Sequence, residues 1–400
     1  MFLRNDRVYY SATDLKGAVE CEWALMRKLD SKLGRIEAVE EVDDPMLVRA
    51  GKLGNEHEAR ALDDYKLKYG DGVVEIDTHD ARADPAILRQ ARDETIAALH
   101  DNKAVVFQAT FFDEPEDSRI GFVGFADFLI HDETANAYQV WDTKLARKAR
   151  VTALLQLAAY ADQMRKLGIP VSNDTYLLLG NGEESKHDLR DIEPVFHDRV
   201  ARLIEMIEAR LEDPNPIEWG AEGYTADGRC DWCAPEVERT RDVLLVAGMR
   251  STQRSRLNAV GIHTIDQLAA STGSVDGIGD HALQKLRDQA RMQLTAPDHV
   301  EGEAHEVLYE VASASALAAL PPQDEGDLFF DFEGDPLWTD NGTDWGIDYL
   351  WGVVTLEPEE KFTAFWAHDR AEEKQALIDF LGFVQERRKQ HPGLHIYHYA

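Results

Sequence analysis

The sequence predicts a mixed α/β protein in which a sheet is flanked by helices. Three runs rich in apolar and β-branched residues follow one another closely: AVVFQATFF (104–112), IGFVGFADFLI (120–130) and AYQVWDTKL (137–145). Segments with apolar residues at helical spacing stand before and after these runs. Neighbouring strands between helices are typical of a sheet that buries its faces under helices. With 400 residues, of which 44% are hydrophobic, the chain can build two or three cores.

The elements around these strands follow from local patterns. Apolar residues recur at helical spacing from Thr13 through Tyr69, and the loop-rich segment 214–236 closes this first region. After the three strands, the patterns predict in order a helix, a strand and a helix: LLQLAAYADQMRKLG (154–168), DTYLLLGN (174–181) and VFHDRVARLIEMIEARLED (195–213). The last of these helices should end before Pro214, because proline cannot continue a helix.

The remainder of the chain divides at a proline-containing segment, ALPPQDEGD, which we interpret as part of a linker. A short helical unit precedes it at about 242–296. Strands are predicted after it at LFFDFEGD, YLWGVV and FTAFWA, followed by a long helix and the strand HIYHYA. Because that strand is also the C-terminus, we expect the last domain to stop in the middle of its fold. The predicted domains and linker are therefore 1–240, 241–300, 301–326 (linker) and 327–400.

Composition limits the classes of function. The net charge of −32 argues against a surface that binds polyanions everywhere, so nucleic-acid contacts must be local. The best basic patch is Lys144, Arg147, Lys148 and Arg150, although charge alone fits a solvated face equally well. No apolar run approaches a membrane span and the N-terminus lacks a signal-peptide pattern, so we expect a cytoplasmic protein without a membrane partner.

Several polar residues interrupt the apolar pattern of the first region. In VWDTK, Asp142 and Lys144 are two residues apart and share one face of a strand, which alone is best explained as a salt bridge at a strand end. Asp127 interrupts the preceding strand, and His57 lies in a predicted helix. Two carboxylates and an imidazole suit Mg²⁺ or Mn²⁺. Taken singly, Asp127 could cap a strand end and His57 could be a helix-surface residue.

In this order the residues resemble the RecB-like branch of the PD-(D/E)xK nucleases, which includes the CRISPR adaptation exonucleases. The resemblance covers about residues 1–240 and extends to a helix with Gln156 and Tyr160, which share one helix face a turn apart. Without the preceding motif, Tyr160 would be read as an ordinary buried tyrosine.

The resemblance implies a chemistry for each position. His57, Asp127, Asp142 and the carbonyl of Thr143 would hold one or two divalent cations, Mg²⁺ or Mn²⁺, which activate water and polarise a phosphate. Lys144 would orient that water or stabilise the transition state, and Gln156 and Tyr160 would position the substrate strand. The expected function is a DNA exonuclease acting on single-stranded or free-ended DNA.

Members of this branch often hold a four-iron, four-sulfur (4Fe-4S) cluster with one cysteine near the N-terminus and three after the core. Cys21, Cys230 and Cys233 fit that spacing, and a CxxC pair can bring two thiolates to one metal centre. The position of the family's last cysteine falls on Arg239, which cannot be a ligand. The open readings are an intact cluster, a cluster with a non-cysteine ligand, a zinc site, and structural thiols.

The helical unit resembles tandem helix-hairpin-helix elements. The hairpin Gly277-Ile278-Gly279 would then offer backbone amides to a DNA phosphate. The alternative is a helical connector in which these glycines only cap helices.

The last domain resembles the RNase H-like fold of the DEDD exonucleases, in which such a pair binds two magnesium ions. Asp331 and Glu333 in LFFDFEGD share a strand face, and the remaining acids of that site would lie beyond residue 400. A solvated strand end is the alternative. In relatives of this architecture a helicase follows. This suggests a second reading of the whole chain, as a non-cleaving nucleic-acid-binding or iron–sulfur clamp that serves an attached helicase.

Overall fold

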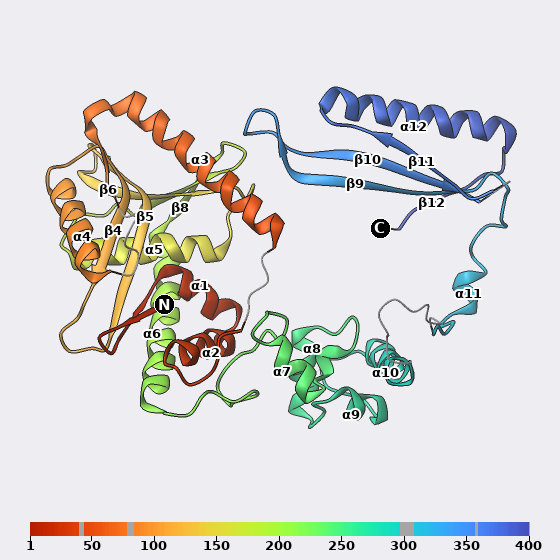
Figure 1. Cartoon of the computed structure of the whole chain (residues 1–400), viewed down its shortest axis with the longest axis horizontal. Helices are drawn as coiled ribbons and strands as arrows, with labels where there is room; N and C mark the ends of the chain where they lie inside the picture. Colours follow the sequence, from red (N-terminus) through yellow and green to blue (C-terminus); the bar gives the residue numbers. More distant parts are fainter. Residues whose placement is uncertain (40–43, 78–83, 297–307, 357–358, 400) are drawn as a thin grey trace. The chain divides into compact units, whose positions relative to one another are not determined.

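The computed structural model describes two compact units, whose elements are labelled in Figure 1. The first unit contains residues 1–179 and 183–309, and the second contains 180–182 and 310–400. The described residues are 1–39, 44–77, 84–296, 308–356 and 359–399.

A mixed eight-stranded sheet forms the centre of the first unit. Its strands are β1 (Phe2–Arg4), β2 (Arg7–Tyr10), β3 (Val73–Glu75), β4 (Val105–Asp113), β5 (Ile120–Asp132), β6 (Ala137–Lys144), β7 (Asp174–Leu179) and β8 (Glu184–Asp188). The order β1-β2-β5-β6-β7-β8 carries β4 and β3 as a branch on β5. Strands β4, β5 and β6 are antiparallel neighbours, whereas β6 and β7 are parallel. The predicted sheet flanked by helices is confirmed.

Helices cover both faces of this sheet (Figure 1). They are α1 (Ala12–Glu20), α2 (Glu22–Lys32), α3 (Pro45–Tyr69), α4 (Pro85–His100), α5 (Val151–Lys166) and α6 (Leu189–Glu212), with a short 3₁₀ turn η1 (Gly70–Gly72). Residues alternate between faces along a strand, so Val140 of β6 joins the core with α5 and α6, while Trp141 packs with α3. This alternation decides from which face of the sheet each polar side chain of β6 projects.

The N-terminal region differs from the single helical stretch expected between Thr13 and Tyr69. Cys21 is extended (φ −160°, ψ 98°) and separates α1 from α2, and its sulfur caps the start of α2. Helix α3 begins only at Pro45, with the Asp44 side chain as its N-cap. The short strands β1, β2, β3 and β8 were not predicted, because three to five residues give too little alternation to recognise.

Residues after α6 build a second, smaller core within the first unit. Its elements are α7 (Ala234–Thr240), the 3₁₀ turn η2 (Val243–Leu245), α8 (Ser251–Ala259), α9 (Ile265–Ala270) and α10 (Asp280–Thr295). Turns at Gly261 (φ +80°) and Gly277 (φ +79°) precede α9 and α10. The predicted helical unit is present, and its resemblance to tandem helix-hairpin-helix elements stays a prediction.

The second unit is a four-stranded sheet with one long helix. The sheet has the order β11-β10-β9-β12, from β9 (Leu328–Thr339), β10 (Trp345–Thr355), β11 (Lys361–Trp366) and β12 (Ile396–Tyr397). Helix α12 (Arg370–Gln390) packs on it through Phe380, and a four-residue helix, α11 (Ala314–Leu317), lies within the predicted linker. None of the helices in the described part of the chain has the length and apolarity that a membrane crossing requires.

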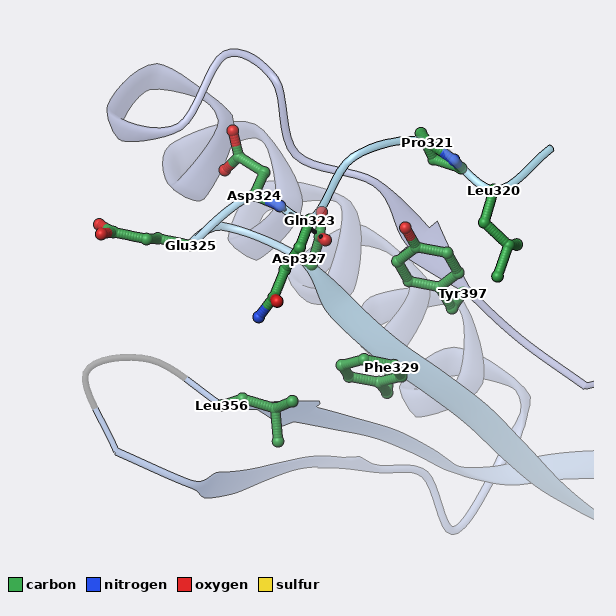
Figure 2. A pocket seen from close by; sticks show the side chains of 9 residues that line it. All are labelled: Leu320, Pro321, Gln323, Asp324, Glu325, Asp327, Phe329, Leu356 and Tyr397. Atoms are coloured by element: carbon green, nitrogen blue, oxygen red, sulfur yellow. Dashed lines mark hydrogen bonds between the residues drawn. The ribbon is translucent and has the colours of Figure 1, made fainter. Parts of the chain in front are cut away.

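A pocket of about 390 Å³ opens at the start of β9 in this unit (Figure 2). Phe329 and Tyr397 stack with ring centroids 5.4 Å apart on one side of it. The acid Asp327 is held by His395, with 3.0 Å between Nδ1 and Oδ1. Asp327 therefore serves the local structure, and neither Asp331 nor Glu333 lines this pocket.

Candidate active site and cysteine centre

The two acids of the first region lie where the β5–β6 hairpin opens. The last pair of residues in the β5–β6 register is Phe128 with Trp141, and continuing that register by one residue sets Asp127 opposite Asp142. The Asp127 carboxylate instead accepts hydrogen bonds from the backbone N–H and the hydroxyl of Thr143, both at 2.8 Å. The opened end of the hairpin thus gathers two carboxylates from neighbouring strands.

Asp142 is fully buried, and Lys144 forms an ion pair with it. Burial raises the pKa of Asp142 well above its usual value, and the negative charge of nearby Asp127 raises it further, while Lys144 acts against both. Burial alone would lower the pKa of Lys144, but the charges of Asp142 and Asp127 outweigh burial and raise it. Two close carboxylates share one ammonium here, so the group favours an added proton or cation.

Lys144 therefore differs from the lysine of an ordinary surface salt bridge. Its side chain is 34% exposed, whereas its partner Asp142 is 0% exposed. A surface pair is worth little because water screens it, but a charge without access to water must be neutralised locally. A salt bridge at a solvated strand end, which the VWDTK pattern alone suggests, does not account for the burial of Asp142.

His57 approaches the same strands from α3. Its side chain is buried, and Nε2 lies 3.2 Å from the carbonyl oxygen of Leu178 in β7. With a proton on Nε2, Nδ1 is the ring nitrogen that can act as a ligand. Helix α3 packs on the sheet face that carries Trp141. Asp142 is the next residue along β6, so its side chain projects from the other face of the sheet.

The structure brings together Asp127, Asp142, Thr143 and Lys144, and it leaves His57 outside that group. Within the described residues, one set of three or more His, Cys, Asp or Glu has all its ligand atoms within 4.8 Å of one another, and it is the cysteine set. The predicted metal-ligand role of His57 therefore stays a prediction that requires this side chain to approach the acids when a cation binds.

Gln156 and Tyr160 contact each other on α5, with 3.1 Å between the amide nitrogen and the phenol oxygen. Tyr160 is buried and stacks on Phe111. Burial raises the pKa of Tyr160, and the charge of Asp142 adds to this, which sets the phenol on the Asp142 side of the sheet. The helix-face pairing expected from the spacing is present beside the acids, and the substrate-positioning role stays a prediction.

Gln108 and Glu58 complete the surroundings of the acids and were not assigned from the sequence. Gln108 lies opposite Asp127 by the β4–β5 register and has φ +53°, an uncommon conformation for a residue other than glycine. Its amide donates to the carboxylate of Glu58, and Glu58 in turn raises the pKa of Lys144. The only sequence signal was one glutamine inside the apolar run AVVFQATFF.

The residues predicted to contact nucleic acid lie at two places in the first unit. Arg147, Lys148 and Arg150 are exposed in the segment between β6 and α5, directly after Lys144. Gly277 and Gly279 are exposed just before α10, and Gly277 has φ +79°, a conformation in which other residues are strained. The turn therefore requires glycine for its own geometry, whether or not it binds phosphate.

Asp331 and Glu333 in the second unit are both exposed. They are two residues apart in β9 and therefore share one face of the strand, whereas Phe330, which precedes Asp331, packs on α12 through Phe380. The backbone N–H of Phe332 donates to Asp331 at 2.9 Å. This pair has the expected common face and none of the burial found at Asp142.

The three cysteines converge although more than two hundred residues separate Cys21 from Cys230 and Cys233. Their sulfur atoms lie within 4.8 Å of one another, and those of Cys21 and Cys233 are 3.6 Å apart. Cys21 and Cys233 are buried and Cys230 is half-buried. The sulfur of Cys21 accepts hydrogen bonds from the backbone N–H groups of Ala24 and Asp227, each at 3.4 Å. Contacts with Cys230 and Cys233 lower the pKa of Cys21 to about 3.

No family model and no curated protein match this sequence. Among solved structures, the chain is similar to the crystal structure of a candidate exonuclease from Eubacterium rectale, with 14% identity and a TM-score of 0.33 over 62% of this chain and 100% of that one. It is also similar to the structure of the protein SSO0001, with 15% identity and a TM-score of 0.21 over 53% of this chain and 93% of that one. The function must therefore be argued from the site itself.

Proposed function

We propose that the first region, residues 1–240, is a metal-dependent DNA nuclease that hydrolyses phosphodiester bonds. The observation that carries this proposal is the fully buried carboxylate of Asp142, with the half-buried carboxylate of Asp127 and the ammonium of Lys144 beside it. One ammonium leaves that group with a net negative charge. A structural salt bridge needs only one acid for one base, whereas the second acid of this group leaves a negative charge that a further cation would neutralise.

Oxygen-rich, negatively charged groups prefer Mg²⁺ or Mn²⁺, and the chemistry of the donors fits these ions. Asp127, Asp142 and the carbonyl oxygen of Thr143 would hold the ion, with His57 as the nitrogen ligand. Once bound, the ion would polarise the scissile phosphate and lower the pKa of a bound water. The Thr143 hydroxyl and N–H keep Asp127 turned toward β6, so the two carboxylates are close together before the ion binds, whereas His57 would have to approach them.

The remaining side chains have roles that follow from their positions. Lys144 stays protonated because its pKa is raised, so it can stabilise negative charge on the phosphate as the bond breaks. Tyr160 and Gln156 border the acids on the α5 side and would orient the substrate strand. Exposed Arg147 and Arg150 continue from Lys144 along the chain and would contact its phosphates.

The test is cleavage of end-labelled single-stranded DNA, and of linear against circular duplex, with Mg²⁺ or Mn²⁺ and with a chelator. We expect cleavage of single-stranded or free-ended DNA that the chelator stops. Asp142→Ala and Lys144→Ala should each lower the rate by about a hundredfold or more, because removing a preorganised charge typically costs about 3 kcal/mol.

The same sheet offers a matched control. Lys186 on β8 and Asp174 on β7 also form a Lys–Asp ion pair, with side chains 56% and 41% exposed. Lys186→Ala and Asp174→Ala should leave the rate unchanged. If these controls lower the rate as much as the Lys144 and Asp142 substitutions do, cleavage does not belong to the proposed site.

A second candidate function is a binding module that no longer cleaves and that serves an attached helicase. It is favoured by the position of His57, which is outside the group formed by the acids. In the same assay this function would give DNA binding without cleavage under every metal and substrate condition. Asp142→Ala would then leave the DNA affinity unchanged or raise it, since one negative charge is removed.

A further inference from the structure

We propose that Cys21, Cys230 and Cys233 bind one tetrahedral zinc ion, rather than a four-iron cluster. The inference is independent of the nuclease proposal, since it concerns a different group of residues. It rests on the spacing of the sulfur atoms, on the number of ligands, and on the hydrogen bonds that Cys21 receives.

The spacing fits ligands of a single ion. With zinc–sulfur bonds of about 2.3 Å in a tetrahedron, two sulfur atoms are about 3.8 Å apart. The sulfur atoms of Cys21 and Cys233 are 3.6 Å apart, and all three lie within 4.8 Å. In a four-iron cluster each cysteine binds a different iron, so the width of the cluster would separate the sulfur atoms. A distance of 3.6 Å is also far beyond a disulfide bond of about 2.05 Å.

The ligand count points the same way. The chain has three cysteines, and within the described residues no His, Asp or Glu joins their group as a fourth ligand. Zinc commonly binds three protein ligands and completes its coordination with water. Cys230 is half-buried, unlike the two other cysteines, so water can reach the centre on its side.

The surroundings of Cys21 suit a thiolate bound to a cation. Its sulfur accepts N–H groups from Ala24 and Asp227, and it lies at the N-terminus of the eleven-residue helix α2, where negative charge is favoured. Such N–H donors to a ligand sulfur orient the ligand and offset part of the negative charge of three thiolates around a divalent ion. They come from two distant segments, which the ion would join.

The experiment is elemental analysis of the whole chain, purified without oxygen from cells supplied with both iron and zinc. We expect about one zinc per chain, no acid-labile sulfide, and a colourless protein. Cobalt should replace the zinc and give the intense visible bands of tetrahedral thiolate coordination. Because all cysteines of the chain belong to this site, a thiol reagent should react slowly with the zinc form and rapidly with all three after chelation.

Variants separate this centre from the acidic one. Cys230→Ser should lose the zinc, and Cys230→His should retain it, because histidine is also a zinc ligand. Asp142→Asn should leave the zinc content unchanged. If Cys230→Ser fails to fold, the metal content of the wild-type protein still decides. Iron with sulfide, iron alone, or a metal-free protein whose thiols react equally with and without chelator would each overturn the proposal, whatever the nuclease assay gives.

Discussion

Each of the two units carries a pair of acids in its sheet, on two adjacent strands in the first unit and on a single strand in the second. The two pairs differ in their access to water. In the first unit Asp142 is fully buried beside Asp127 and Lys144, whereas Asp331 and Glu333 in the second unit are exposed on the open face of β9. Water solvates the exposed pair, so it requires no partner. The buried carboxylate of Asp142 costs free energy unless a proton or a cation neutralises it, and this cost is the physical argument for the proposed site.

The difference in burial separates two acidic motifs that look alike in the sequence. Both pairs were predicted by resemblance; Asp127 and Asp142 lie on neighbouring strands, whereas Asp331 and Glu333 lie two residues apart on β9. Only the first has neighbours whose properties depend on it: Lys144, Tyr160 and Glu58 all interact electrostatically with it or with its lysine. Substitutions in the two units test this contrast.

The largest effect should be on catalysis. Asp127→Ala should lower the Mg²⁺-dependent cleavage rate by about a hundredfold or more, since it removes a cation ligand. The double substitution Asp331→Ala with Glu333→Ala should leave the rate within about twofold. The measurement is the initial rate on single-stranded DNA under equal conditions. A reversed order of the two effects would assign the chemistry to the second unit.

A second prediction concerns stability and pH. The pKa of Asp142 is raised in the folded state, so its contribution to stability is present below the unfolded pKa of about 4 and is lost as the pH rises through the folded value. Without metal, Asp142→Asn should therefore raise the melting temperature at pH 8 by a few degrees relative to wild type, and by less at pH 5. Mg²⁺ should stabilise wild type at pH 8 but not the variant.

The matched comparison for this prediction is Asp331→Asn. Asp331 is exposed and solvated by water, so the melting temperature of this variant should be the same as that of wild type at both pH values, with and without Mg²⁺. Differential scanning fluorimetry of the three proteins measures all these quantities. Equal Mg²⁺ stabilisation of wild type and Asp142→Asn would remove the metal site from the proposal.

A third prediction concerns Gln108, and two substitutions separate its strain from its hydrogen bond. Gln108→Ala keeps a side chain on a backbone with φ +53°, whereas Gln108→Gly removes the strain of that conformation. The glycine variant should therefore be more stable than the alanine variant by about 1 kcal/mol. Both lose the bond to Glu58 and should cleave about fivefold more slowly at limiting Mg²⁺. Urea unfolding and the Mg²⁺ dependence of the rate measure the two effects. Identical stabilities would mean that the conformation at 108 is unstrained.

The smallest effect should come from the basic segment after Lys144. Arg147→Ala and Lys148→Ala should each weaken binding of single-stranded DNA by a few-fold, and the slope of affinity against salt should fall by about 0.7 per lost phosphate contact. The rate at saturating DNA should not change. Affinity that is insensitive to both substitutions and to salt would leave this segment as a solvated face.

The sequence predicted those parts of the molecule whose pattern is long. Three strands and helix α5 were recognised because eight or more residues repeat one period, and the register of β5 and β6 then sets Asp127 opposite Asp142. The short strands, the break at Cys21 and the role of Gln108 could not be predicted in the same way. Each depends on contacts distant in sequence, such as the bond from Gln108 to Glu58, which no local pattern encodes.

The segment 217–225 is hydrogen-bonded to helix α2, and this has a consequence for synthesis on the ribosome. The backbone of Trp23 donates to Thr225 and its indole N–H to Glu218, while the N–H of Ile217 donates to Asp30. A nascent chain that ends after α6 has every strand of the sheet, and α2 can already pack on α1 and α6, but it lacks the hydrogen bonds to residues 217–225. Because domains fold while the chain emerges from the N-terminus, these last contacts of α2 form only after the whole sheet has been made.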